Sequence, residues 1–134
     1  MLKIRNLDLI TSKVHDFSML DLHFITSFHY TVAIDTVALF DVHNKSTLVI
    51  DFVLVPKDRH ATYKVTIRFY TLGSLNLSTD GKVIQLSGFE ILDIADRGWE
   101  SITYQVRDFE KEEDFMFYCN KIEVVSIEEV HWII

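Results

Sequence analysis

The sequence predicts a mainly β fold, a single antiparallel β-sandwich or flattened barrel of about seven or eight strands, with room for one short helix. Three observations predict it. Apolar and polar side chains alternate with a period of two in several short segments. Turn-forming residues separate these segments roughly every 10 to 15 residues, and no gap would hold a helix between successive strands. With one Pro and four Gly among 134 residues there is no obvious hinge, so we expect one domain over residues 1–134.

The clearest strand signal covers residues 63–70. Apolar side chains occupy its odd-numbered positions and polar ones positions 64, 66 and 68, which gives the segment one apolar and one polar face. Residues 102–107 alternate in the same way. Residues 47–55 are apolar on both faces, interrupted by Asp51, as is typical of a central strand between two layers.

Two longer segments change phase partway along. In residues 115–125 the polar Asn120 and Lys121 interrupt the alternation, which predicts a bulge or bend where the apolar face switches. Residues 17–25 change phase near Met19.

Turn signals fit between the predicted strands. Pro56, which cannot donate a hydrogen bond to a ladder, follows the strand at 47–55. The Asp80-Gly81 pair predicts a β-hairpin. Residues 109–114 separate the last two long strands.

Residues 27–40 are compatible with two structures. Four apolar residues of this segment would line one face of a helix: Val32, Ala33, Val37 and Phe40. The β-branched residues of the same stretch suit a strand. We expect a strand, with a short helix as the alternative.

The charge of the chain limits the classes of partner. Twenty acidic and 13 basic residues give a formal net charge of −7. This disfavours nucleic acid and anionic membranes, because both require clustered Lys and Arg. It permits a basic protein partner, since opposite fields speed the encounter of two proteins.

Sequence features also predict the location. No apolar run approaches the roughly 18 residues of a membrane span, and residues 1–10 lack the blocks of a signal peptide. The single cysteine, Cys119, excludes an internal disulfide and favours a reducing, cytoplasmic setting.

Motifs for catalysis are not found in the sequence. The six histidines lack the spacing of metal ligands, and the scattered glycines form no phosphate-binding loop, so we expect no metal and no cofactor. Cys119 lies among apolar residues, which favours a core position over a nucleophile. Acidic residues of the loops could pair as acid and base, yet acidic turns are common. The sequence therefore predicts a protein that is not an enzyme, with no catalytic residues.

The segment from residue 93 to residue 110 has the composition of a binding surface. A Trp beside Arg and carboxylates is typical of interaction hot spots. The predicted partner-binding residues are Asp93, Asp96, Arg97, Trp99, Arg107, Asp108 and Glu110. The alternative is that Trp99 covers the core at the start of a strand and Arg97 pairs with a nearby acid.

Four segments together resemble a known group of proteins. They are His15-Asp16 with Leu20, Leu22 and Phe24 on a first long strand, residues 65–70, residues 86–91, and residues 117–120 followed by 122–124. In this order they resemble immunity proteins of bacterial polymorphic-toxin systems and uncharacterised β domains related to them. The resemblance covers residues 14–125, with no counterpart for residues 27–44. It implies a cytoplasmic protein that binds and blocks a partner without catalysis, and it carries over no site residues.

The favoured function is therefore a non-catalytic protein-binding module of the toxin-neutralising immunity type, whose negative charge suits a basic toxin domain and not nucleic acid. The alternatives are a carrier of a small apolar ligand inside a β-barrel and, less favoured, a small enzyme. A homo-oligomer is compatible with all three. An exposed apolar strand such as residues 47–55, or the apolar end at residues 132–134, would favour one.

Overall fold

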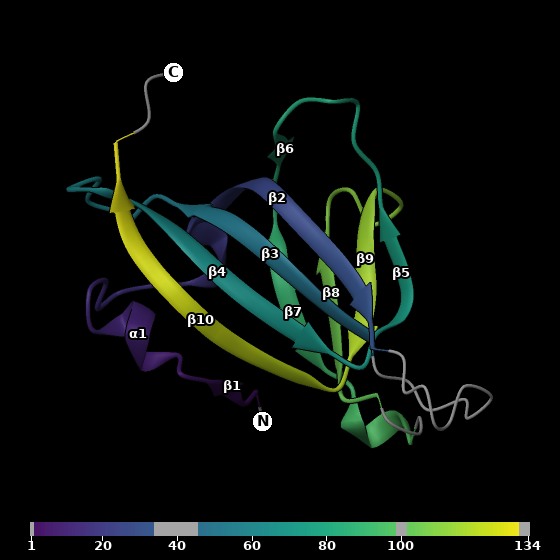
Figure 1. Ribbon diagram of the computed structural model, residues 1–134. Coiled ribbons are helices and arrows are strands. Elements are labelled where there is room, and N and C mark those ends of the chain that lie inside the picture. The colour runs from purple at the N-terminus through teal and green to yellow at the C-terminus, as the bar shows by residue number, and fades with distance from the viewer. Residues whose placement is uncertain (1, 34–45, 99–101, 132–134) are drawn as a thin grey trace.

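Two β-sheets face each other across a hydrophobic core in the computed structural model (Figure 1). The structure describes residues 2–33, 46–98 and 102–131. The sheets are separate and do not close into a barrel, so the predicted mainly β fold is confirmed in its sandwich form. No helix in these ranges is long and apolar enough to cross a membrane.

The larger sheet has six strands and the smaller one four. The order of the larger sheet is β1 (Ile4–Arg5), β10 (Lys121–Val130), β4 (Thr62–Tyr70), β3 (Ser46–Leu54), β2 (Leu22–Val32) and β6 (Ile84–Gln85). The smaller sheet follows the order β5 (Gly73–Leu77), β9 (Phe115–Cys119), β8 (Tyr104–Asp108) and β7 (Phe89–Asp93). Neighbouring strands are antiparallel except β1, which is parallel to β10.

Three short helical segments connect these strands in the described parts of the chain. They are α1 (Asp8–Thr11) and the 3-10 turns η1 (Met19–Asp21) and η2 (Ala95–Arg97). Residues 27–32 belong to β2, as expected, and most of the remaining segment up to residue 40 lies outside the described residues. The α-helix of the described chain is therefore at the N-terminal end and not in the segment where a helix was the alternative.

The alternation in β4 has the predicted consequence for burial. Tyr63, Val65, Ile67 and Phe69 are buried, and the polar residues between them are half-buried on the other face. Beside it, β3 lies in the centre of the larger sheet between β2 and β4. Its central position explains its apolar character and removes it as an exposed strand for oligomer formation.

The predicted bend at Asn120 is the point where the chain changes sheets. β9 ends at Cys119 in the smaller sheet and β10 begins at Lys121 in the larger one. The Asn120 backbone N–H donates to the Tyr70 carbonyl at 2.9 Å, and the Thr103 hydroxyl donates to the Asn120 side-chain oxygen at 2.8 Å. These bonds fix the crossing, which is a bend between two strands and not a bulge within one.

Two local predictions are corrected. Asp80-Gly81 forms a turn, with Gly81 at φ 92°, but the flanking strands β5 and β6 lie in different sheets and make no hairpin. The first long strand begins at Leu22, so Leu20 lies before it in the 3-10 turn η1. That turn is the physical cause of the phase change near Met19.

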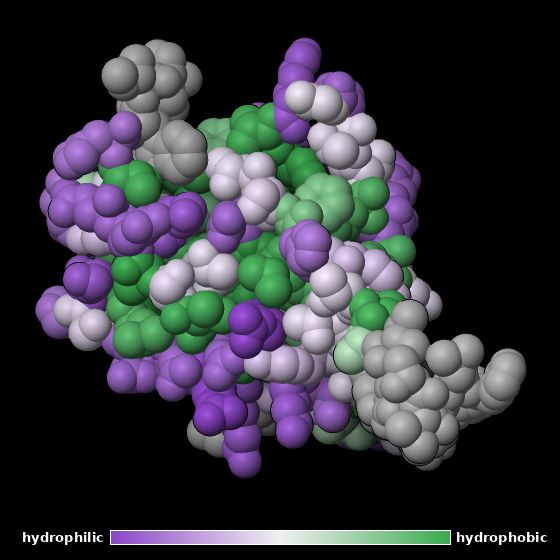
Figure 2. All heavy atoms as spheres, viewed as in Figure 1, coloured by the Kyte–Doolittle hydropathy of each residue, from purple (hydrophilic) through white to green (hydrophobic). Residues whose placement is uncertain are grey.

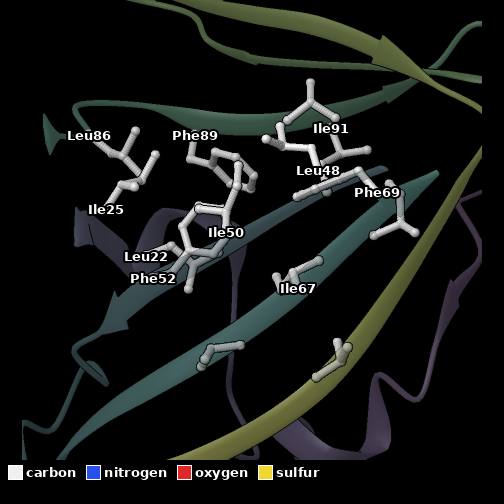
Figure 3. Packing of buried hydrophobic residues seen from close by; sticks show 14 of the residues in the cluster. Leu22, Ile25, Leu48, Ile50, Phe52, Ile67, Phe69, Leu86, Phe89 and Ile91 are labelled. Carbon is white, nitrogen blue, oxygen red and sulfur yellow. The ribbon is translucent and has the colours of Figure 1, made fainter. Parts of the chain in front are cut away.

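Aromatic rings join the two sheets in the core. Phe52 of β3 contacts Phe89 of β7 edge-on, with ring centroids 5.1 Å apart, and Figure 3 shows these two rings side by side. The contacts continue from Phe89 to Phe115 at 6.0 Å, from Phe115 to Phe117 at 5.8 Å and from Phe117 to Phe69 at 5.0 Å. These rings pack in the core between the two sheets of the described chain.

Candidate partner-binding site

The predicted binding residues fall at the two ends of the β7–β8 pair. The register of this pair places Asp93 opposite Tyr104 at one end and Phe89 opposite Asp108 at the other. Asp93, Asp96 and Arg97 therefore lie at the end that carries η2, and Arg107, Asp108 and Glu110 lie at the opposite end (Figure 1). Trp99 lies outside the described residues.

The η2 end is built on a short turn. The Asp93 carboxylate accepts a hydrogen bond from the Ala95 backbone N–H at 3.0 Å, and Gly98 ends the turn in the left-handed region at φ 69°. Asp96 and Arg97 are exposed. The turn offers charged side chains to solvent, and residues 93–98 themselves contain none of the exposed large apolar side chains of the described chain.

Asp108 lies at the other end and is buried. Its side chain is only 1% exposed, which is unusual for a carboxylate. One oxygen accepts from the Ser87 backbone N–H at 2.8 Å and the other from the Glu110 backbone N–H at 3.0 Å. Asp108 thus ties the β8–β9 loop to the segment before β7, and its burial leaves it no surface to offer a partner.

Arg107 holds the same loop from its outer side. Its Nε donates to Glu90 of β7 at 2.6 Å, and its Nη1 donates to Glu112 of the loop at 3.2 Å. The hydrogen bond and charge of Glu90, aided by Glu112, raise the pKa of the Arg107 guanidinium. The carboxylate of Glu112 is therefore held beside β7.

Phe109 is the residue of this loop that the sequence argument missed. It is 47% exposed, although its backbone N–H is fixed by the Gly88 carbonyl at 3.0 Å. Its ring lies so close to Gly88 that a Cβ added there would stand 2.3 to 2.6 Å from three ring carbons. Only glycine at position 88 leaves room for the ring. In the sequence, the available signal was an aromatic residue next to a run of acidic ones.

The β8–β9 loop, residues 109–114, is acidic around this ring, and we call it the acidic loop. Together with the two preceding residues it contains five acidic and two basic side chains, a net charge of −3. It lies at the same end as the β5–β6 connection (Figure 1). A polar hollow of about 420 Å³ between them is lined by Asp80, Lys82, Lys111 and Asp114 among others.

No protein-family model, curated protein or solved structure matches this chain. In residues 2–33, 46–98 and 102–131, no group of three His, Cys, Asp or Glu side chains could hold a metal ion. This end of the sandwich is a charged surface that exposes the ring of Phe109, and the half-exposed Val83 lines the hollow beside the acidic loop.

The outer face of the larger sheet is a second exposed surface. Figure 2 shows it as hydrophobic areas between polar side chains. Asp51 accepts hydrogen bonds from the Ser27 hydroxyl at 2.7 Å and the Thr66 hydroxyl at 2.6 Å, which satisfies this carboxylate within the sheet. A groove of about 620 Å³ beside it is lined by Phe24, Val53 and other residues. An apolar group of a ligand would fit this groove rather than the core.

Cys119 is a core residue, as its sequence context predicted. Its side chain has no exposed surface, and burial raises the pKa of the thiol to about 12. The thiol therefore remains protonated near neutral pH and is a poor nucleophile.

We expect Cys119 not to react with iodoacetamide in the folded protein at pH 7 and to react fully in urea. Because folding raises this pKa from 9.0, the stability that depends on the neutral thiol is complete below pH 9 and is lost as the pH rises towards 12. Mass spectrometry of the alkylated protein checks the first result. The free energy of unfolding against pH, compared with C119A, checks the second. Rapid alkylation of the native protein would contradict the buried position.

Proposed function

We propose that this chain is a non-catalytic protein-binding module that binds a basic protein through the acidic loop, in the manner of an immunity protein that neutralises a toxin in the cytoplasm. One observation carries the proposal. Phe109 is held half-exposed on Gly88 at the start of a loop with an excess of acidic side chains.

The arrangement has the composition of an interaction hot spot. In protein interfaces a few large side chains supply most of the binding energy, and polar side chains surround them. Phe109 is the exposed apolar centre, and Glu110, Glu112 and Glu113 are its exposed acidic surroundings. A Lys- and Arg-rich surface with an apolar hollow would match both parts.

The loop is held in place before any partner binds. Asp108 fixes its first residues, Arg107 holds Glu112, and the Asn76 side chain donates to the Glu113 carbonyl at 2.7 Å. Ordering side chains and loops on association costs free energy, so a loop that is already ordered binds more tightly. In this proposal Arg107 and Asp108 support the contact surface through these bonds, and the exposed Glu110 remains a contact.

The biological part of the proposal depends on two further supports. The resemblance to immunity proteins implies a partner that is a toxin domain. The net charge of −7 favours fast association with a basic protein at low salt. Co-purification of the tagged chain from its native host, with identification of a basic toxin domain encoded nearby, is the first test. Recovery of the free chain alone would count against the proposal.

With that partner in hand, F109A is expected to weaken binding at least about tenfold, the usual cost of losing a hot-spot side chain. G88A is expected to weaken it too, because the new methyl group displaces the ring, while the exposed position of the ring keeps the cost in stability small. Isothermal titration calorimetry measures both. In the F109A background G88A should add little further loss.

The matched control is F28A, which removes another half-exposed Phe, 41% exposed, from β2 of the other sheet. It should leave the affinity unchanged. Affinity should also fall as salt increases, since the charges of the loop are exposed and screened. Equal affinities for F109A and the wild type would overturn the proposed site.

A further inference from the structure

One edge of the larger sheet has no strand beside it over most of its length. β2 pairs with β3 from Leu22 to Val32, but on its other side it pairs with β6 only through Phe24 and Ile25. Within the described chain no strand pairs with this side of residues 26–32. Backbone N–H and C=O groups of an edge strand remain available to pair with another strand.

From Ser27 to Val32 this edge lacks the features that usually prevent pairing, because the two register shifts of β2 lie before Ser27. Residues 22–32 contain no Asp, Glu, Lys, Arg or Pro. The other edges are different in this respect. β10 carries Glu128 and Glu129 and a register shift, β7 carries Glu90 and Asp93, and β5 has a register shift along its five residues.

An apolar strip accompanies the free edge. Phe28, Tyr30 and Val32 are 41%, 50% and 50% exposed. They pair in register with Ile50, Leu48 and Ser46 of β3, which are all buried. Directly opposite residues point to the same face of a sheet, so the strip lies on the core face at a margin that the smaller sheet leaves partly uncovered.

We propose that residues 26–32 of β2 pair antiparallel with the same residues of a second copy of this chain, about a twofold axis. In such an isologous pairing residue i of one copy faces residue j of the other and j faces i, so both copies bring the same charges to the interface. This strand has none. Because the rest of the molecule carries the whole net charge of −7, the neutral edge is where two copies approach with least repulsion.

The pairing also covers the apolar strip. The twofold axis places both core faces on the same side of the joined sheet, so that Phe28, Tyr30 and Val32 of the two copies lie beside each other. One strand pair with three apolar side chains from each copy is smaller than the roughly 1,200 Å² of a standard interface. The dimer should therefore dissociate on dilution.

Sedimentation velocity from about 1 μM to about 1 mM, the range of moderate dissociation constants, tests the proposal. The wild type should pass from monomer to dimer, and V32K, which places an ammonium group in the strip, should remain a monomer. V125K is the matched control: the same substitution at a Val that is 39% exposed, on β10 at the other side of the larger sheet, should dimerise like the wild type. Amide exchange in residues 26–32 should slow as the concentration rises.

A wild-type monomer at every concentration, or a V32K protein that dimerises like the wild type, would overturn the proposal. Salt separates this interface from the complex with a basic protein. Screening reduces the repulsion between two acidic copies, so dimerisation should strengthen with salt, whereas binding at the acidic loop should weaken. F109A should leave the dimer intact, so the two proposals can fail independently.

Discussion

Replacing Phe117 by Ala should destabilise the protein by about 3–5 kcal/mol, the usual cost of removing a fully buried Phe. Phe117 has no exposed surface and contacts rings in both sheets, Phe69 across the core and Phe115 on its own strand. The substitution removes apolar burial, leaves a cavity and breaks the row of edge-on rings that joins the sheets. Urea denaturation followed by circular dichroism measures the change.

The control for this result is F109A, which makes the same chemical change at a half-exposed ring. That substitution should cost much less, because the ring buries less surface and its site opens to solvent. If F117A and F109A cost similar amounts, the row of rings would not be the main connection between the sheets. A loss for F117A within about 0.5 kcal/mol of zero would contradict the packing itself.

The strands could be predicted from the sequence because their pattern is local. A period of two places alternate side chains on opposite faces, and Tyr63 to Phe69 follow it without interruption. The sheet to which each strand belongs is not local. Asp80-Gly81 has the composition of a hairpin turn, yet the chain crosses there from one sheet to the other, and only packing of the whole core decides this.

The candidate site shows the same limit. Its charged residues stand out in the sequence, but their roles depend on which side chains the fold buries. Asp108 and Glu110 are two residues apart, and one is buried while the other is exposed. Phe109 is absent from the predicted binding residues, because its exposure depends on the fold, which places its ring against Gly88.

Asp108 gives the second large effect. D108N should destabilise the protein by about 1–3 kcal/mol, the cost of leaving a buried polar group without its partner. Both carboxylate oxygens accept backbone N–H groups, from Ser87 and from Glu110. An amide keeps one acceptor and turns an NH₂ group towards the other donor, so one hydrogen bond is replaced by the contact of two donors.

D114N is the matched control, since it removes the same charge from an exposed residue of the same loop and should change stability by less than about 0.5 kcal/mol. Chemical denaturation of both variants decides the point. If D108N is as stable as D114N, the Asp108 carboxylate does not hold the loop.

If D108N is less stable than D114N, the D108N substitution should also weaken partner binding at Phe109. The reason is that Ser87 and Glu110, on either side of the ring, lose a hydrogen bond that fixes their position. A D108N protein that is destabilised but binds the basic partner with full affinity would separate the stability of the loop from its function.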